Sequence, residues 1–209
     1  MIKILIADDH TIVREGLKQI VSNAPGLFVT GEASNGQETL DLIRKNNFDV
    51  ILLDICMPEK DGLAILKQLK REKIELPVLV LSMHPEEQYA VRMLKMGAAG
   101  YLTKASASDE LINAIKKIAT GKKYISDSLA EKLALDLDID TEKHLYEYLS
   151  DREFQVMCMI ASGKTVTNIA EELSLSVNTI STYRVRVLNK MKMTSNSELT
   201  RYAIKNQIV

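Results

Sequence analysis

The chain has few of the residues and segments that mark disulfide-stapled or membrane-bound proteins. Its 209 residues include only two cysteines, Cys56 and Cys158, which are far apart and form no CxxC pair. This cysteine usage indicates a reducing compartment. No run approaches the roughly 18 to 20 apolar residues that a membrane span needs, and the apolar stretch at 2–7 is too short for a signal peptide. We therefore expect a cytoplasmic protein that does not contact a membrane.

The chain also lacks common nucleotide-binding and zinc-binding patterns. It contains no G-x-x-x-x-G-K-[ST] and no G-x-G-x-x-G, the glycine-rich loops that hold nucleotide phosphates. His10, His84 and His144 have no cysteine or glutamate at metal-site spacing, so we interpret them as surface or packing residues. Neither a nucleotide site nor a zinc site is expected.

Charge is divided unevenly along the chain, although the formal net charge is only −1. Residues 1–125 have a net charge of +1 and residues 126–149 a net charge of −5, whereas residues 150–209 have +3. The stretch 177–192 contains no acidic residue and four basic ones, Arg184, Arg186, Lys190 and Lys192. A local basic stretch of this kind is typical of a small DNA-reading element.

Short apolar runs alternate with helical patterns over residues 1–121. The apolar runs predict strands near 2–7, 28–33, 49–53, 77–82 and 100–103. Short apolar runs bounded in this way are typical of buried parallel strands, and the segments between them have apolar residues at helical spacing. Because right-handed crossovers place helices on both faces of such a sheet, we predict a doubly wound, five-stranded α/β domain.

Polar side chains stand where four of these strands end. Asp8 and Asp9 follow the first strand, Asp54 the third and Lys104 the fifth, and Ser82 ends the fourth. The carboxyl ends of parallel strands line one crevice, so these side chains should converge there. Carboxylates this close repel one another, and a divalent cation such as Mg²⁺ relieves the repulsion. A lysine and a hydroxyl suit a phosphoryl group, which a carboxylate beside a metal can accept as an acyl phosphate.

Residues 150–209 change to an all-helical pattern. Ser150 and Glu153 form an S-x-x-E capping box that opens one helix. The turn at 174–176 separates a second helix from a third, which starts after Ser176 and is basic. Two helices joined by a turn of three or four residues form a helix-turn-helix pattern. A plain four-helix structural cap has the same apolar periodicity, but it leaves the basic face of the third helix unexplained.

Residues 122–149 are predicted to link the two domains. Leu129, Leu133 and Leu137 are four residues apart, which indicates a short amphipathic helix. The acidic segment that follows is expected to be exposed and mobile. A tether with no role beyond spacing is an equally open interpretation.

Motifs in both parts of the chain point to one family. The segments ADDH at 7–10, LLDICMP at 52–58, DG at 61–62, LS at 81–82 and GYLTK at 100–104 resemble a receiver domain. The segments LSDRE and GKTVTNIAEELSLSVNTISTYRVRVLNKM within 149–192 resemble the LuxR-type helix-turn-helix. Together they resemble a two-component response regulator of the NarL/FixJ class, and STYRVR is similar to the branch that contains GacA, UvrY and BvgA.

This resemblance implies a partner histidine kinase and a role for each residue of the crevice. Asp54 would be the phosphoacceptor, and Ser82 and Lys104 would engage the phosphoryl group. Mg²⁺ would be bound by Asp9, Asp54 and the backbone carbonyl of Cys56, with Asp8 acting mostly through water. Tyr101 takes the place of the family's switch aromatic, although a surface ring on an edge strand is its alternative interpretation. Phosphorylation would be followed by homodimerisation.

The third helix of the C-terminal domain is expected to enter the major groove of double-stranded promoter DNA. Its outer face would present Asn178, Ser181, Thr182, Val185 and Arg186, and the resemblance places Ser181, Thr182 and Val185 nearest the base edges. Ser and Thr read bases permissively, and apolar methyl groups suit thymine. Phosphate contacts are expected from Arg184, Arg186 and Lys190. Thr165, at the start of the preceding helix, would add a contact with the DNA backbone.

Three functions from different classes remain open. The first is a DNA-binding transcription regulator that is gated by phosphorylation and performs no chemistry beyond that at Asp54. The second is a small Mg²⁺-dependent phosphatase, which also uses a strand-end Asp nucleophile. It lacks the D-x-D arrangement at the Asp54 strand end and leaves the helix-turn-helix without a role. The third is a signalling adaptor whose C-terminal helices bind a protein, which the basic third helix argues against.

Overall fold

The structure is a computed structural model of the chain, and it describes residues 1–57, 62–83, 86–106, 108–126, 129–130, 145–206 and 208–209. The chain divides into two compact units, Met1–Ile139 and Asp140–Val209. Most of the predicted linker helix, with Leu133 and Leu137, lies outside the described residues, as do His84, His144 and Pro58.

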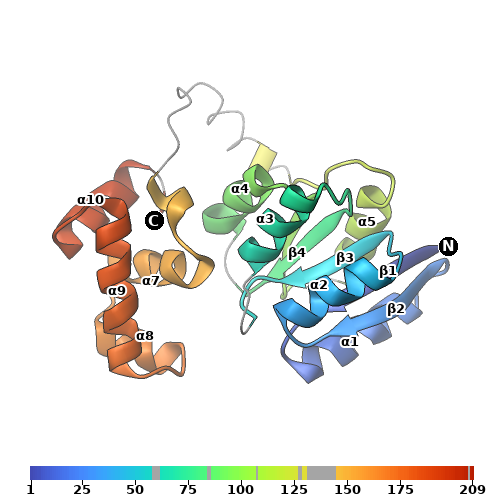
Figure 1. Ribbon diagram of the computed structural model, residues 1–209, viewed down its shortest axis with the longest axis horizontal. Helices are drawn as coiled ribbons and strands as arrows, with labels where there is room; N and C mark the ends of the chain where they lie inside the picture. Colours follow the sequence, from blue (N-terminus) through green and yellow to red (C-terminus); the bar gives the residue numbers. More distant parts are fainter. Residues whose placement is uncertain (58–61, 84–85, 107, 127–128, 131–144, 207) are drawn as a thin grey trace. The chain divides into compact units, whose positions relative to one another are not determined.

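The N-terminal unit contains one parallel sheet with the strand order β2-β1-β3-β4-β5. Its strands are β1 (Ile2–Ala7), β2 (Leu27–Ala33), β3 (Val50–Asp54), β4 (Val78–Ser82) and β5 (Gly100–Thr103). Helices alternate with them along the chain (Figure 1): α1 (Thr11–Ser22), α2 (Gly36–Lys45), α3 (Gly62–Glu72), α4 (Glu86–Met96) and α5 (Ser108–Ile118). The predicted doubly wound α/β fold is confirmed.

Both faces of the sheet are covered, because its central strands are apolar on both sides. Alternate strand residues pack with α1 and α5 in one cluster, which includes Ile4, Ile6, Leu52, Leu79 and Leu102. On the other side α3 contacts both α2 and α4. Every residue of β3 and β4 is buried. The continuous apolar runs of the sequence therefore correspond to strands that have no solvent-facing side.

Two strands begin one residue later than the sequence predicts, and one of them also ends one residue later. The strand predicted at 49–53 is Val50–Asp54, and the strand predicted at 77–82 is Val78–Ser82. The difference at Asp54 arises because the parallel ladder continues to this residue and pairs it with Leu81. Asp54 and Ser82 are thus the last residues of their strands, which holds both at the carboxyl edge of the sheet.

The C-terminal unit is helical within the described residues. It contains the short 3₁₀-helix η1 (Leu145–Tyr148) and the helices α7 (Asp151–Ala161), α8 (Val166–Glu172), α9 (Val177–Met191) and α10 (Asn196–Lys205). Helix α7 packs against α9 and α10, and α8 packs against α9. The turn from α8 to α9 includes Ser174 with a positive φ of 53°. This pair of helices and its turn form the predicted helix-turn-helix.

Polar side chains fix the start of each long helix in this unit. Ser150 accepts a hydrogen bond from the backbone N–H of Glu153 and the Glu153 carboxylate accepts one from that of Ser150, so the predicted capping box is confirmed. Ser176 and Ser195 cap α9 and α10 in the same position. Such caps satisfy helix N–H groups that have no partner within the helix.

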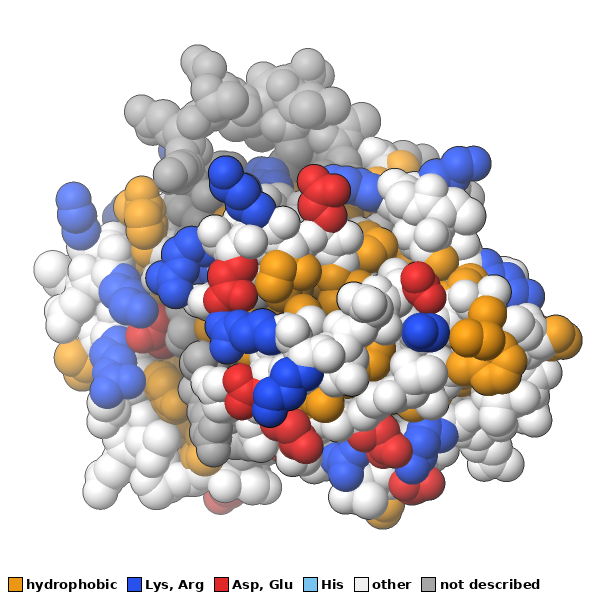
Figure 2. Space-filling view, turned by 45° about the vertical axis from the view of Figure 1, so that its right-hand side comes forward, with side chains coloured by type: hydrophobic (Ala, Val, Ile, Leu, Met, Phe, Trp, Pro, Cys, Tyr) orange, Lys and Arg blue, Asp and Glu red, His pale blue; other side chains and the backbone are white. Residues whose placement is uncertain are grey.

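Exposed hydrophobic side chains are distributed over both units. Ile12, Met1 and Met83 are the most exposed of them in the N-terminal unit, and Val185 and Ile204 are exposed in the C-terminal unit. On the face shown in Figure 2, hydrophobic side chains form small groups among basic and acidic ones. Within the described residues, no helix has the length and apolar character needed to cross a membrane.

Candidate functional site

The sheet brings the predicted carboxylates together in one pocket. Ligand atoms of Asp8, Asp9, His10 and Asp54 all lie within 4.8 Å of one another. Asp8 and Asp54 are buried, with exposed fractions of 1% and 4%, whereas the Asp9 side chain is 30% exposed. The arrangement follows from topology, because β1 and β3 are neighbours and both end at this edge. The pocket therefore has two buried acids and one that faces its mouth.

Lys104 supplies the positive charge of this pocket. Its Nζ atom lies 2.6 Å from Asp8 Oδ2 and 3.0 Å from Asp54 Oδ2. Its backbone N–H donates to the Ser82 carbonyl at 2.7 Å, so β4 and β5 carry Ser82 and Lys104 to the same edge. One ammonium group thus bridges two buried carboxylates.

These close charges shift the pKa values in the pocket. Burial raises the pKa of the Asp54 carboxyl more than the charge of Lys104 lowers it, and the charge of Asp8 adds to the rise. Burial alone would lower the pKa of Lys104, but the charges of Asp54 and Asp8 hold it above its ordinary value. Asp54 is therefore a carboxylate held in a poorly solvated site beside a fully charged ammonium.

The remaining crevice residues are placed by the strands that carry them. Ser82 and Tyr101 are each 1% exposed. The interpretation of Tyr101 as a surface ring on an edge strand is therefore wrong: β5 is the edge strand, but the ring is covered. Cys56, two residues after Asp54, is half-buried, and its backbone N–H donates to the Asp54 carboxylate.

Gly62 allows the loop after Asp54 to pass close to the end of β3. Its backbone N–H donates to the Ile55 carbonyl at 2.9 Å. A Cβ atom on Gly62 would lie 3.0 Å from both the Asp54 carbonyl oxygen and Ile55 Cα. A side chain there would have to displace backbone next to Asp54, which accounts for glycine at this position.

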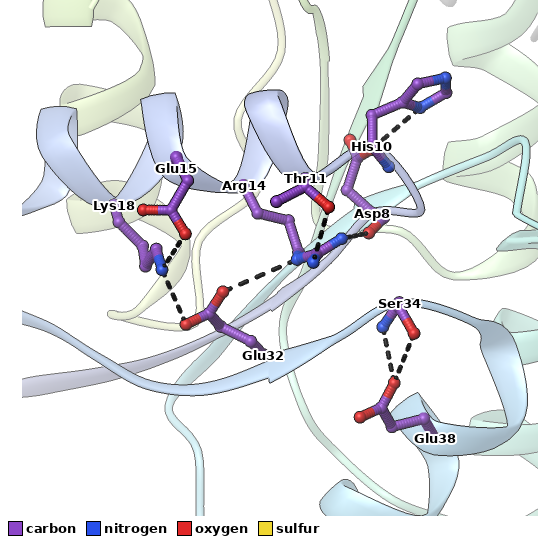
Figure 3. Close-up of polar contacts among 9 residues, drawn as sticks. All are labelled: Asp8, His10, Thr11, Arg14, Glu15, Lys18, Glu32, Ser34 and Glu38. Atoms are coloured by element: carbon purple, nitrogen blue, oxygen red, sulfur yellow. Dashed lines mark hydrogen bonds and ion pairs between the residues drawn. The ribbon is translucent and has the colours of Figure 1, made fainter.

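Sequence reasoning missed two contacts of the loop between β1 and α1. His10 is exposed as expected, but its Nδ1 atom lies 2.8 Å from Asp9 Oδ1 and 3.3 Å from Asp8 Oδ1. Arg14 reaches back from α1, and its Nη1 donates to the Asp8 backbone carbonyl at 2.7 Å (Figure 3). No sequence motif indicated the Arg14 contact, since its acceptor is a main-chain atom.

Helix α9 presents the face that the sequence predicted. Ile180, Val187, Leu188 and Met191 are buried. The side chains predicted to face DNA lie on the opposite side: Asn178, Thr182, Val185 and Arg186 are exposed, and Ser181 is half-exposed. The Thr182 hydroxyl donates to the Asn178 carbonyl at 2.9 Å.

Several of the predicted phosphate-binding side chains already have a partner within the protein. Arg184 Nε donates to Asn196 Oδ1 of α10 at 2.7 Å. Lys190 Nζ lies 2.6 Å from Glu153 Oε2 of α7. Thr165 caps α8 by accepting from the backbone N–H of Asn168. These contacts fix the side chains of Arg184 and Thr165, and they show that Lys190 already has an anionic partner within the protein.

Replacing Glu153 with Gln is expected to lower the free energy of unfolding of the C-terminal unit by about 1–2 kcal/mol, because it weakens both a helix cap and an ion pair. Burial raises the pKa of the Glu153 carboxyl, but Lys190 and the Ser150 N–H together hold this pKa below its ordinary value of 4.5. Its stabilisation is thus present above pH 4.5 and lost as the pH falls through the lower folded pKa. Urea unfolding at pH 7 and at lower pH measures both effects.

The control for that experiment is Glu172→Gln. Glu172 also pairs with a lysine, Lys164, but its side chain is 54% exposed and that of Lys164 is 40% exposed. Exposed pairs contribute little, so this variant should unfold like the wild type. Equal effects of Glu153→Gln and Glu172→Gln would contradict a structural role for the Glu153 contacts.

Both units match known protein families. The family described as "Response regulator receiver domain" matches residues 4–116, and that described as "Bacterial regulatory proteins, luxR family" matches residues 147–203. The chain belongs to the two-component response regulators that carry a LuxR-type DNA-binding domain.

Response regulators of other bacteria match nearly the whole chain. The chain is 36% identical to the response regulator UvrY of Escherichia coli K12 over 208 residues, covering 99% of this chain and 95% of that protein. It is 36% identical to the response regulator GacA of Pseudomonas aeruginosa PAO1 over 211 residues, covering 100% and 98%. The predicted resemblance to this branch of response regulators is confirmed.

A solved structure has the same fold. It is that of RcsB from Salmonella enterica serovar Typhimurium, bound to a promoter in the presence of phosphomimetic BeF₃⁻. It is 27% identical to this chain, covers 96% of it and 97% of RcsB, and has a TM-score of 0.60.

Proposed function

We propose that Mg²⁺-dependent phosphorylation of Asp54 by a sensor histidine kinase gates dimerisation and sequence-specific DNA binding by this protein. The observation that carries the proposal is the pocket itself: Asp8, Asp9 and Asp54 meet within 4.8 Å, and Lys104 Nζ lies 3.0 Å from Asp54. Family membership supports the same reading, because a phosphatase or an adaptor would leave one of the two matched domains without a role.

The transfer is a displacement at phosphorus. One Asp54 carboxylate oxygen forms a bond to the phosphorus atom as the P–N bond of the kinase phosphohistidine breaks. The electron pair of that bond leaves with the imidazole, which takes up a proton. Lys104 neutralises the Asp54 carboxylate before the transfer and a phosphoryl oxygen after it. Ser82 hydrogen-bonds another phosphoryl oxygen, and Tyr101 responds as the switch aromatic when Ser82 moves.

The residues of the pocket fit a small divalent cation. Their donor atoms lie within 4.8 Å of one another, close to the span of about 4 Å expected across a Mg²⁺ shell with bonds of about 2.1 Å. Asp9, Asp54 and the Cys56 carbonyl would hold the ion directly, and Asp8 would act through water. When bound, Mg²⁺ offsets carboxylate repulsion and the charge of the incoming phosphoryl group.

The experiment that tests phosphorylation is intact mass spectrometry after incubation with a small-molecule phosphoryl donor. We expect one phosphoryl group per chain in Mg²⁺ and none in EDTA, with fragmentation placing it on Asp54. Incorporation in EDTA, or at another residue, would contradict the proposal.

The DNA-binding part of the proposal rests on α9. Ser181, Thr182 and Val185 would lie nearest the base edges, with Asn178 on the same outer face. Arg184, Arg186, Lys190 and Thr165 would contact the DNA backbone. Residues 1–121 would form the receiver domain, 122–149 the linker and 150–209 the DNA-binding domain. A single copy has few strong base-reading side chains, so a homodimer on half-sites about one helical turn apart is the proposed active form.

Replacing Arg184 with Ala is expected to weaken binding to all DNA sequences about equally and to reduce the salt slope of log K by about one. The reason is that the Arg184 guanidinium donates to Asn196 of α10. Held in this way, Arg184 would contribute positive charge and would not read bases. Fluorescence anisotropy at several salt concentrations measures the slope. Arg201→Ala, on the exposed side of α10, is the control. A changed sequence preference in Arg184→Ala would assign Arg184 to base reading instead.

A further inference from the structure

Arg14 contacts the loop of the acidic pocket through a main-chain atom, not through a carboxylate. It belongs to the first turn of α1, and its side chain is only 15% exposed. Figure 3 shows its guanidinium between three elements. It donates to the Asp8 carbonyl at 2.7 Å and to the Thr11 hydroxyl at 3.3 Å, and its Nε lies 3.6 Å from Glu32 Oε2 on β2.

The contact with the Asp8 carbonyl fixes one particular peptide group. This carbonyl belongs to the planar peptide that joins Asp8 to Asp9, so holding it restricts the backbone from which both carboxylates extend. Two other contacts hold the Asp8 end: its N–H donates to the Ala33 carbonyl at 3.1 Å, and its Oδ1 accepts from the His10 N–H at 2.9 Å. Asp8 is thus held at its N–H, its side chain and its carbonyl.

Glu32 in turn orients Arg14, and it does so from a neighbouring strand. Its Oε2 faces Arg14 Nε, while its Oε1 binds Lys18 Nζ at 3.0 Å. Lys18 also pairs with Glu15. Arg14 and Lys18 therefore share one carboxylate and lie one turn apart on α1. Within the described part of the chain, Arg14 donates to the loop that carries Asp8 and Asp9, whereas Lys18 pairs with Glu15 and Glu32 (Figure 3).

We propose that Arg14 is a positioning residue for the divalent-cation pocket. It holds the Asp8–Asp9 peptide so that both carboxylates face the ion, and the Glu32 carboxylate holds the guanidinium in place. This inference rests on the proposed function, since it concerns the same Mg²⁺ pocket. Residues that orient metal ligands in this way commonly change metal affinity about 10- to 100-fold when they are replaced.

The sign of the effect separates positioning from simple electrostatics. Arg14→Met and Lys18→Met each remove one positive charge from α1. If through-space repulsion alone mattered, both variants would bind Mg²⁺ more tightly than the wild type. If Arg14 positions the loop, Arg14→Met binds Mg²⁺ more weakly while Lys18→Met does not.

The test is isothermal titration calorimetry of the full-length protein with Mg²⁺, for the wild type, Arg14→Met, Arg14→Lys, Glu32→Gln and Lys18→Met. We expect Arg14→Met to raise the Kd about tenfold with one site retained. Arg14→Lys should recover part of the affinity, because an ammonium can still donate to the carbonyl. Glu32→Gln should raise the Kd less than Arg14→Met, and Lys18→Met should leave it unchanged or lower.

Two outcomes would overturn the inference, and they are distinguishable. A wild-type protein that binds no Mg²⁺ contradicts the proposed function together with the inference. A wild type that binds Mg²⁺ while Arg14→Met binds it equally or more tightly contradicts the inference alone. Retained stoichiometry, together with the thermal unfolding of each apo variant, separates weaker binding from loss of folded protein.

Discussion

Replacing Asp54 with Asn is expected to abolish phosphoryl incorporation and, at neutral pH, to make the N-terminal unit more stable. An amide is not a nucleophile toward phosphorus, and no other acid in the described pocket contacts Lys104 except Asp8. Stability should rise because the variant removes a buried charge that lies beside Asp8, while Lys104 keeps its ion pair with Asp8 at 2.6 Å. The incorporated phosphoryl group is counted by intact mass and the stability is measured by urea unfolding.

The stability gain has a defined pH dependence. Burial raises the pKa of Asp54 above its ordinary value of 3.8, so the folded protein holds this proton more tightly than the unfolded chain. Above the folded pKa, the charge on Asp54 therefore lowers the free energy of unfolding by its full amount. This loss of stability disappears as the pH falls below about 4. The difference in unfolding free energy between Asp54→Asn and the wild type should be largest at pH 7.

A matched control for this variant is Asp41→Asn on α2. The Asp41 side chain is 47% exposed and lies 3.5 Å from Arg44, so its replacement should change neither incorporation nor stability appreciably. Phosphoryl transfer that persists in Asp54→Asn would remove Asp54 from the role proposed for it. A less stable Asp54→Asn protein would contradict the electrostatic description of the pocket.

Replacing Lys104 with Met is expected to lower the free energy of unfolding by about 3 kcal/mol at pH 7 in the absence of divalent cations. The variant leaves two carboxylates, exposed by only 1% and 4%, without their shared ammonium, and breaking a buried ion pair from one side is strongly destabilising. Mg²⁺ should restore part of this loss, because it offsets the same repulsion. Urea unfolding with Mg²⁺ and with EDTA measures both quantities.

The double variant Asp54→Asn/Lys104→Met tests the cause of that loss. Removing one of the two carboxylates should return much of the stability, since the effects of groups in contact are not additive. Lys164→Met is the exposed control, because Lys164 pairs with the exposed Glu172. If Lys104→Met were no more destabilising than Lys164→Met, the ion pairs of Lys104 would not stabilise the fold, contrary to this prediction.

The fold could be predicted from local patterns because each element has a clear hydrophobic period. Continuous apolar runs indicated strands buried on both faces, and the order of strands and helices then determined a doubly wound sheet. The positions of strand ends were less certain, since hydrogen bonding between neighbours decides them. Asp54 belongs to β3 because the ladder pairs it with Leu81, which no local pattern in either strand indicates.

The pocket was predictable for a related reason, and its surroundings were not. The carboxyl ends of parallel strands share one edge, so the meeting of Asp8, Asp54 and Lys104 followed from their positions after apolar runs. By contrast, the bond from Arg14 to the Asp8 carbonyl has a main-chain acceptor. Lys190 and Glu153 are 37 residues apart in sequence and lie on different helices. Only the packing of these helices shows that Lys190 has an acidic partner within the protein.

The measurement that tests the central claim most directly is selection from a pooled genomic DNA library by the full-length protein in Mg²⁺. Wild type is compared with and without a small-molecule phosphoryl donor, alongside Asp54→Ala treated with the donor. The account predicts that donor-treated wild type gains specific sites, arranged as paired half-sites, and that the other two samples do not. Equal binding in all three samples would contradict phosphorylation of Asp54 as the gate of DNA binding.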